Sequence, residues 1–394
     1  SLQFAKKFLP IASRKCSTRL PQVCAGQPAR LFASGSSGAA DDLEKLSPEE
    51  LRKLVKDLRS QAPKSTDPKA PQPADAATTR AALSGTKGDA SDSKNITIVE
   101  LQRLRDRKQP ITMVTAYDFP SAVHVDMAGV DVILVGDSVG MVVLGHDTTL
   151  PVTFDDILHH CKAVSRGAQR PLLVGDMPFG SYEVSPHQAQ HNAYRLLKEG
   201  GMEAVKVEGA DPWRLRTVET LVRGGIAVMG HIGLTPQSYS TLGGFRAQGR
   251  HAKQALELIE QAKRLEQAGV FAMVIECVPP EVAKVLTESV SVPTIGIGAG
   301  PHTSGQVLVY HDLLGIMHHP HHAKVTPKFC KQYSSVGASI NQALREYVQE
   351  VRSGAFPGPQ FSPYTMVSGE IETFRKGVEA MRAAPPKPAD AGGA

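Results

Sequence analysis

Three acidic side chains follow short apolar runs in this chain, at positions where strands of a sheet would end. Asp137, Asp176 and Glu208 each come at or just after the end of a run rich in β-branched residues. Carboxylates that meet at one place repel one another unless a cation lies between them. Ligands that are all oxygen atoms favour a hard ion such as Mg²⁺ over zinc. The three residues are therefore candidate magnesium ligands.

Lys206 and Glu276 add an ammonium group and a fourth carboxylate to this set. Lys206 lies two residues before Glu208, so both side chains face the same side of a strand. An ammonium beside a bound cation suits an α-keto acid, whose carboxylate and keto oxygens can both bind Mg²⁺. Such binding favours removal of a proton from the carbon next to the carbonyl. Glu276 follows the apolar run 271–275 and is the candidate general base for that step.

Each of these residues also has a structural interpretation. An Asp after a strand is often the N-cap of the next helix, and Glu276 could form a salt bridge with a cation from a loop. N-capping explains a single Asp, but it gives no reason for Lys206, Glu208 and Glu276 to lie at the ends of their own strands. The pattern as a whole therefore favours a catalytic site.

Three other candidates are less specific. Cys277 adjoins Glu276, but in a strand it would point to the opposite face, so we expect a buried structural thiol. The histidines within 318–322 lack the rigid helical spacing of a zinc site, so we expect a surface loop. His231 could contact a substrate or be a hydrogen-bonded histidine of the core or rim, and both interpretations stay open.

Eight short apolar runs are the elements that must position these residues. The runs cover residues 111–116, 130–135, 171–175, 204–207, 226–230, 270–275, 292–297 and 307–310, and helical periodicity lies between several of them, at 187–198, 212–222 and 252–267. Eight such alternations predict a closed (β/α)8 TIM barrel, whose active site lies at the C-terminal ends of the strands. An open doubly wound sheet is less favoured, because Pro301 stands where its G-x-G-x-x-G fingerprint requires the last glycine.

The composition is that of a globular enzyme. The chain has 394 residues, of which 41% are hydrophobic and 21% charged, and no apolar run approaches the roughly 20 residues that span a bilayer. The net charge of +5 owes much to six basic residues within positions 1–30, so we expect neither a nucleic-acid nor a membrane partner. Five cysteines without C-x-x-C spacing indicate a reducing compartment.

The chain divides into four segments by composition. Residues 1–40 are basic, rich in serine and free of acidic residues, which predicts a mitochondrial transit peptide, with a disordered basic tail as the alternative. Residues 41–95 read as a linker with one short amphipathic helix that begins after Ser47. Residues 96–360 form the predicted catalytic barrel, and 361–394 form an extension that ends in a disordered tail.

Several ordered blocks of the barrel segment resemble the ketopantoate hydroxymethyltransferase family. They include VGDSVGM at 135–141, GHDTTLPVT at 145–153, VKVEG at 205–209, GHIGLTPQ at 230–237 and IECVP at 275–279, with shorter blocks at 115–118, 176–179 and 295–300. The resemblance covers about residues 96–360 in collinear order. It implies a (β/α)8 barrel, commonly a decamer and here therefore a homo-oligomer, that makes ketopantoate for pantothenate and coenzyme A synthesis.

The resemblance also implies a role for each candidate residue. The one-carbon donor would be 5,10-methylenetetrahydrofolate and the acceptor 3-methyl-2-oxobutanoate. By motif, Mg²⁺ would be held by Asp137, Asp176 and Glu208. The keto acid would contact Asp137, Ser138, Asp176 and Lys206, and Glu276 would accept the proton. This chain departs from compact members of the family by its N-terminal extension, its histidine-rich loop and its C-terminal tail.

Two alternatives use the same barrel. One is a magnesium-dependent lyase that forms or cleaves a carbon–carbon bond of an oxo acid without folate. The other is a non-catalytic assembly protein, which the complete set of acidic residues at the rim argues against. Turnover with and without methylenetetrahydrofolate separates the first alternative from the transferase.

Overall fold

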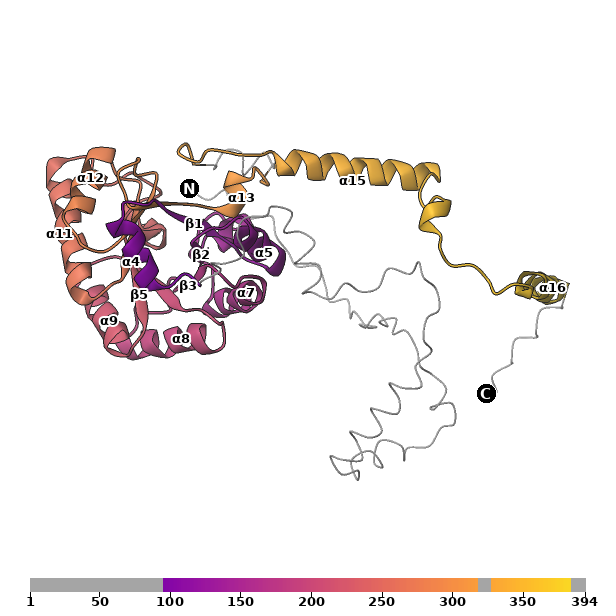
Figure 1. The fold of residues 1–394 in the computed structure, drawn as a ribbon, viewed down its shortest axis with the longest axis horizontal. Coiled ribbons are helices and arrows are strands. Elements are labelled where there is room, and N and C mark those ends of the chain that lie inside the picture. Colours follow the sequence, from indigo (N-terminus) through magenta and orange to yellow (C-terminus); the bar gives the residue numbers. More distant parts are fainter. Residues whose placement is uncertain (1–94, 318–326, 384–394) are drawn as a thin grey trace, which may run out of the picture. The chain divides into compact units, whose positions relative to one another are not determined.

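Eight parallel strands close into a barrel in the computed structural model, which describes residues 95–317 and 327–383 (Figure 1). The strands are β1 (Ile111–Thr115), β2 (Val132–Val135), β3 (Leu172–Asp176), β4 (Ala204–Glu208), β5 (Ala227–Gly233), β6 (Ala272–Glu276), β7 (Thr294–Ile297) and β8 (Gly305–Leu308). Each strand pairs with its neighbours in sequence, and β8 returns to β1 with Ile111 opposite Gly305. The predicted (β/α)8 barrel is confirmed.

Helices follow most strands and cover the outside of the barrel. Those of nine or more residues before β8 are α4 (Ile98–Asp106), α5 (Phe119–Met127), α7 (Phe154–Gly167), α8 (Pro186–Lys198), α9 (Pro212–Arg223), α11 (Ala252–Ala268) and α12 (Pro280–Glu288). The helices predicted at 187–198, 212–222 and 252–267 are confirmed to within one residue at each end. Local chemistry explains their starts, since Ser185 and Asp211 accept hydrogen bonds from the first turns of α8 and α9, each of which begins with proline.

The apolar side chains form two layers, because successive residues of a strand point to opposite faces. In β2, Val132 and Leu134 point into the barrel, whereas Ile133 and Val135 pack against the surrounding helices. Every residue of β2, β3 and β4 is buried, as expected for a parallel sheet with both faces covered. The same alternation decides which polar residues reach the barrel interior.

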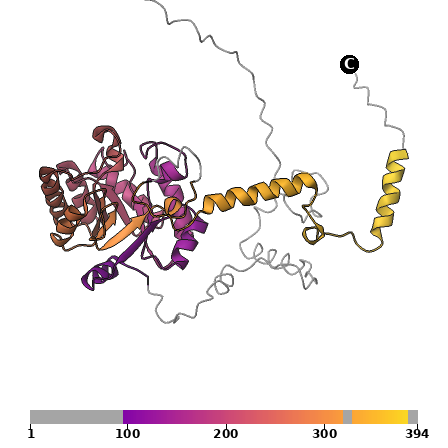
Figure 2. The same cartoon turned by 90° about the horizontal axis from the view of Figure 1, so that it is seen from above.

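Helix α4 closes the N-terminal end of the barrel. Leu101 on α4 is fully buried and belongs to the interior layer together with Ile111 of β1. Arg105 and Gln102 donate hydrogen bonds to the carbonyls of Val290 and Ser291, which precede β7. Figure 2 shows α4, in dark purple, at the start of β1. Because this end is closed, a ligand reaches the interior from the opposite end.

The eighth apolar run differs from its prediction. The run 307–310 was expected to be strand throughout, but β8 ends at Leu308, and Tyr310 begins the short helix α13 (Tyr310–Leu313). The amide of Tyr310 donates a hydrogen bond to Oγ1 of Thr115 at the end of β1, which turns the chain at this point. The first seven runs also start or end up to three residues from their predicted bounds.

The remaining helices are short pieces in the loops and two longer helices after the barrel. The short pieces are α6 (Val139–Val142), η1 (Pro236–Ser238), α10 (Tyr239–Leu242) and η2 (Pro359–Phe361); the longer helices are α15 (Val336–Ser353) and α16 (Glu370–Ala383). The sequence also predicts a closing helix at 335–351, which is confirmed as α15, whereas α16 was not predicted. Within the described residues, no helix combines the length and the hydropathy that a membrane span requires.

Several sequence predictions lie outside the described residues. They are the transit peptide at 1–40, the linker and its helix at 41–94, the histidine-rich loop at 318–322 and the tail beyond 383. By its internal contacts the chain separates into residues 1–88 and 89–394, and all described residues belong to the second unit.

Candidate active site

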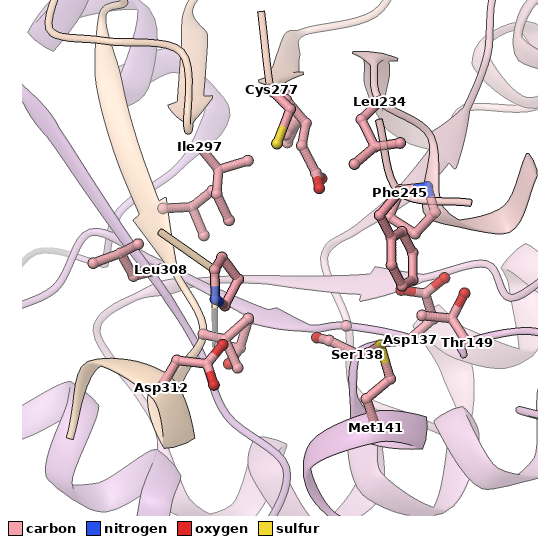
Figure 3. Close-up of a pocket in the computed structure, with 18 of the residues that line it drawn as sticks. Asp137, Ser138, Met141, Thr149, Leu234, Phe245, Cys277, Ile297, Leu308 and Asp312 are labelled. Atoms are coloured by element: carbon pink, nitrogen blue, oxygen red, sulfur yellow. The ribbon is translucent and has the colours of Figure 1, made fainter. Parts of the chain in front are cut away.

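A cavity of about 480 Å³ opens at the C-terminal ends of the strands (Figure 3). It is lined by residues from the strands and from the loops that follow them, including all six site residues predicted from the sequence. These are Asp137, Ser138, Asp176, Lys206, Glu208 and Glu276. The structure therefore brings the predicted residues together in one cavity, at the end of the barrel where enzymes of this fold bind their substrates.

Strand alternation explains why most of these side chains point inward. Val174 of β3 and Val274 of β6 belong to the barrel interior, so Asp176 and Glu276, two residues further along, also face the barrel axis. Ala204 is an interior residue of β4, which places Lys206 and Glu208 on the same inner face. The inner face of these strands thus changes from apolar to ionisable at the rim.

Lys206 lies at the centre of the acidic side chains. Its Nζ is 2.9 Å from Oδ1 of Asp176 and 3.3 Å from Oε1 of Glu208. Burial alone would lower the pKa of Lys206, but the charges of Asp176, Glu208 and Asp137 raise it well above its usual range. For Glu208, burial is outweighed mainly by Lys206 and then by His231, so its pKa falls to about 2. The ammonium and Glu208 are therefore both charged at neutral pH.

Asp137 and Asp176 are buried close to each other. The backbone amide of Asp137 donates a hydrogen bond of 3.0 Å to Oδ2 of Asp176. Burial and the neighbouring charge of Asp176 raise the pKa of Asp137 well above its usual range, and burial together with Glu208 raises that of Asp176. An additional positive charge beside these two buried carboxyl groups would stabilise their ionised forms, as a bound cation does in many functional sites.

The donor set fits a hard divalent cation in chemistry. Asp137, Asp176 and Glu208 offer only oxygen atoms as ligands. Oδ1 of Asp176 is buried and forms an ion pair with Lys206, but it accepts no well-oriented hydrogen bond from the described residues. Among the residues that the structure describes, however, no three acidic, histidine or cysteine side chains converge into a ready metal cage. Lys206 lies between the carboxylates instead, so the chemistry of the ligands, rather than a preformed cage, supports the magnesium interpretation.

Gln237 joins the acidic side chains, although the sequence interpretation assigned it no role. Its side-chain amide donates to Oδ2 of Asp137 at 2.9 Å, and its backbone amide donates to Oε2 of Glu208 at 3.1 Å. The hydroxyl of Tyr182 in turn donates to Oε1 of Gln237 at 2.6 Å. Gln237 is the last residue of the block 230–237, one of those that carry the family resemblance. Its place in that block was the feature of the sequence that could have identified it as a site residue.

His231 connects Glu208 with Glu276. Its Nδ1 is 3.4 Å from Oε1 of Glu208, and its Nε2 is 3.2 Å from Oε2 of Glu276. Burial and the charge of Lys206 would lower the pKa of His231, but Glu208 and then Glu276 raise it to about 9. His231 follows Met229 of the interior by two residues, so the alternation rule that identified Lys206 also applies to it. The sequence left open whether His231 contacts a substrate or is a hydrogen-bonded histidine of the core or rim. In the structure it lines the cavity and contacts Glu208 and Glu276.

Two residues near Asp137 complete this side of the cavity. The hydroxyl oxygens of Ser138 and Tyr117 lie 2.8 Å apart. Burial is the main cause that raises the pKa of Tyr117, so its hydroxyl is protonated at neutral pH. Thr149, which no sequence argument singled out, has a buried Oγ1 without a hydrogen-bond partner among the described residues. Figure 3 shows Thr149 beside Asp137.

The prediction for Cys277 was wrong. It was expected to point away from the site, but it lies just beyond the end of β6 with φ of 51°. This left-handed conformation ends the strand alternation, so the side chain lines the same cavity as Glu276 (Figure 3). Burial and the charge of Glu276 raise the pKa of the thiol to about 12, so it is protonated at neutral pH and is not a nucleophile.

Comparisons with known proteins agree with one another. Residues 95–359 match the family model described as ketopantoate hydroxymethyltransferase. The chain is 59% identical over 282 residues to 3-methyl-2-oxobutanoate hydroxymethyltransferase 1, mitochondrial, of Arabidopsis thaliana, covering 72% of this chain and 81% of that protein. It is 57% identical to the protein of the same name from Oryza sativa subsp. japonica, with 73% and 79% covered. A bacterial relative, 3-methyl-2-oxobutanoate hydroxymethyltransferase of Heliobacterium modesticaldum, is 53% identical, with 68% and 96% covered.

Proposed function

The chain belongs to the ketopantoate hydroxymethyltransferase family, and from this membership we propose that it converts 3-methyl-2-oxobutanoate into ketopantoate. The one-carbon unit would come from 5,10-methylenetetrahydrofolate, and the product would enter pantothenate synthesis. The observation that carries the proposal is the inward-facing set of Asp176, Lys206, Glu208 and Glu276 at the mouth of one barrel, within a chain 59% identical to a named enzyme of this activity.

A mitochondrial location agrees with this function. Plant relatives from Arabidopsis thaliana and Oryza sativa are named mitochondrial. The basic, acid-free composition of residues 1–40 has the character of a mitochondrial transit peptide.

We assign binding of the keto acid to the side of the cavity that holds Lys206. The buried ammonium would attract the substrate carboxylate or keto oxygen, and Ser138 would add a hydroxyl hydrogen bond. Asp137, Asp176 and Glu208 would hold Mg²⁺, which when bound would polarise the keto group of the substrate. Gln237 would keep Asp137 and Glu208 in place through its two hydrogen bonds.

Glu276 is the proposed general base. Unlike Asp176 and Glu208, it forms no ion pair with Lys206 among the described residues, and its Oε2 lies 3.2 Å from Nε2 of His231. His231 would hold the carboxylate toward the cavity, where it removes the proton from C3 of the keto acid. Lys206 would stabilise the negative charge that moves onto the keto oxygen. In the overall reaction, C3 forms a bond to the methylene carbon, the bonds from that carbon to the two folate nitrogens break, one water molecule supplies the hydroxyl of ketopantoate, and tetrahydrofolate leaves.

Assembly into a homo-oligomer is a further part of the proposal. Helix α15 carries apolar side chains that are exposed in the described chain, among them Ile340, Leu344, Tyr347 and Val351. Exposed apolar residues at helical spacing are typical of a surface that packs against another protein chain. They agree with the oligomer that the family resemblance implies, and the mass of the purified protein in solution tests it.

Two assays on the full chain test the activity. Ketopantoate formation should require methylenetetrahydrofolate; turnover of the keto acid without folate would instead favour a lyase, and no turnover at all would favour the non-catalytic protein. Glu276→Gln should slow exchange of the C3 hydrogen with D₂O by about 10²- to 10⁴-fold while the keto acid still binds. Glu281→Gln is the matched control, because it removes a charge from the exposed first turn of α12. Full exchange in Glu276→Gln would refute the assignment of the base.

A further inference from the structure

The cavity extends well beyond the cluster around Lys206. Its volume of about 480 Å³ lies in the range of pockets that hold drug-sized ligands, whereas the keto acid has only five carbon atoms. Figure 3 shows Asp312 on the opposite side of the cavity from Asp137 and Thr149, with Ser138 between them. This second side has a polar group and apolar walls of its own, and the mechanism above uses none of them.

Asp312 is a carboxylate in this part of the cavity for which the described residues supply no partner. It lies on α13 after β8 and makes neither a side-chain hydrogen bond nor an ion pair within the described ranges 95–317 and 327–383. Burial raises its pKa to about 6. A half-buried carboxylate that the described residues leave unpaired can accept hydrogen bonds from a ligand at a low desolvation cost.

An aromatic ring lies in the same region. Phe329 lines the cavity with 37% of its surface exposed, and its ring rests against Gly298, where an added Cβ would lie only 2.6 Å from Cδ1 of the ring. The neighbouring Cys330 lines the same cavity as Asp312, and burial and then the charge of Asp312 raise the pKa of its thiol. The amide of Tyr333 donates to the carbonyl of Leu313 at 2.7 Å, which ties this segment to α13.

We propose that Asp312 and Phe329 form the subsite for the pterin ring of the folate, an inference that rests on the function proposed above. The pyrimidine edge of a pterin carries an N3–H and a 2-amino group side by side, and these can donate two parallel hydrogen bonds to one carboxylate. A flat ring bound in this way can stack on the exposed face of Phe329. Because Asp312 lies across the cavity from Asp137, the opposite edge of the pterin, near the methylene carbon, then faces the keto acid.

The first test compares the two substrates in one variant of the full chain. Asp312→Asn should raise the KM for methylenetetrahydrofolate about 10- to 100-fold, the effect of losing hydrogen bonds to a charged acceptor. The KM for the keto acid and the folate-independent C3 exchange should change less than about threefold. Glu288→Gln, which removes a charge from the exposed end of α12, is the control and should leave both KM values unchanged.

A second test asks whether Asp312 recognises the 2-amino group. The wild-type protein should prefer tetrahydrofolate over 2-desamino-2-methyltetrahydrofolate by about tenfold or more in calorimetric binding, and Asp312→Asn should lose most of this preference. Phe329→Leu should weaken binding of both folates equally. Equal binding of tetrahydrofolate to wild type and Asp312→Asn would overturn the subsite. Because binding does not require turnover, this result is separate from a failure to form ketopantoate, which would refute the proposed function.

Discussion

Replacing Asp312 by Asn should stabilise the folded protein in the absence of ligand. The Asp312 carboxylate is half-buried without compensating contacts among the described residues, and this burial raises its pKa from 3.8 to about 6. A carboxyl group that binds its proton more tightly in the folded state destabilises that state wherever it is ionised. Asparagine has nearly the same shape but never carries this charge.

The expected gain follows from the difference between the two pKa values. A change from 3.8 to about 6 corresponds to about 3 kcal/mol in the free energy of unfolding above both values. Because Asp312 is only half-buried, contact with solvent reduces this figure to about 1–2 kcal/mol. For a barrel of this size, that gain raises Tm by about 2 to 8 °C.

The difference in stability between Asp312→Asn and wild type should depend on pH in a defined direction. The folded-state pKa is raised, so the unfavourable contribution of Asp312 is absent below about pH 4, grows between about pH 4 and 6, and is complete above about pH 6. Thermal melting of Asp312→Asn and wild type at about pH 4 and pH 8 should therefore give equal Tm values at the lower pH and a higher Tm for the variant at the higher pH. A variant that is less stable at pH 8, or a difference independent of pH, would refute the reasoning. Glu288→Gln serves again as the charge control.

Two further predictions concern the metal and the aromatic wall. Asp176→Asn should raise the Mg²⁺ concentration for half-maximal activity by about 10- to 100-fold in a titration of chelator-treated protein, and wild-type activity that survives chelation would contradict a magnesium site. Gly298→Ala should cost about 1 kcal/mol or more in denaturant unfolding and raise the folate KM, because Gly298 has φ of 62° and the new Cβ would displace Phe329. Gly243→Ala is its control, since φ is 66° there with open space around it; an equal folate KM in both variants would rule out the contact with Phe329.

The fold could be predicted because local rules act along each segment. Apolar runs of about five residues that alternate with helical patterns indicate a parallel sheet covered by helices, and eight such runs favour a closed barrel over an open sheet. Caps such as Ser185 mark where helices begin. The bounds of the strands were less accurate, because hydrogen bonds between strands decide where a strand ends. The run at 307–310 shows this, since the bond from Tyr310 to Thr115 of β1 begins a helix inside it.

Candidate residues on strands were found for the same reason. Asp176, Lys206, Glu208 and Glu276 lie at even spacing from interior apolar residues, so the period of two places them at the barrel mouth. His231 obeys the same rule, but the sequence alone left its role open. Cys277 was misplaced because the alternation stops where the backbone turns at the end of β6.

The sequence by itself determined the barrel and the inward ring of ionisable side chains, because both depend on periodicity within single strands. Only the tertiary structure decided that Gln237 bonds to Asp137 beside that ring and that Asp312 and Phe329 line another part of the same cavity. These residues come from connections after the strands, where no period constrains the direction of a side chain. Their positions depend on contacts between segments far apart in the chain, such as the packing of Phe329 on Gly298.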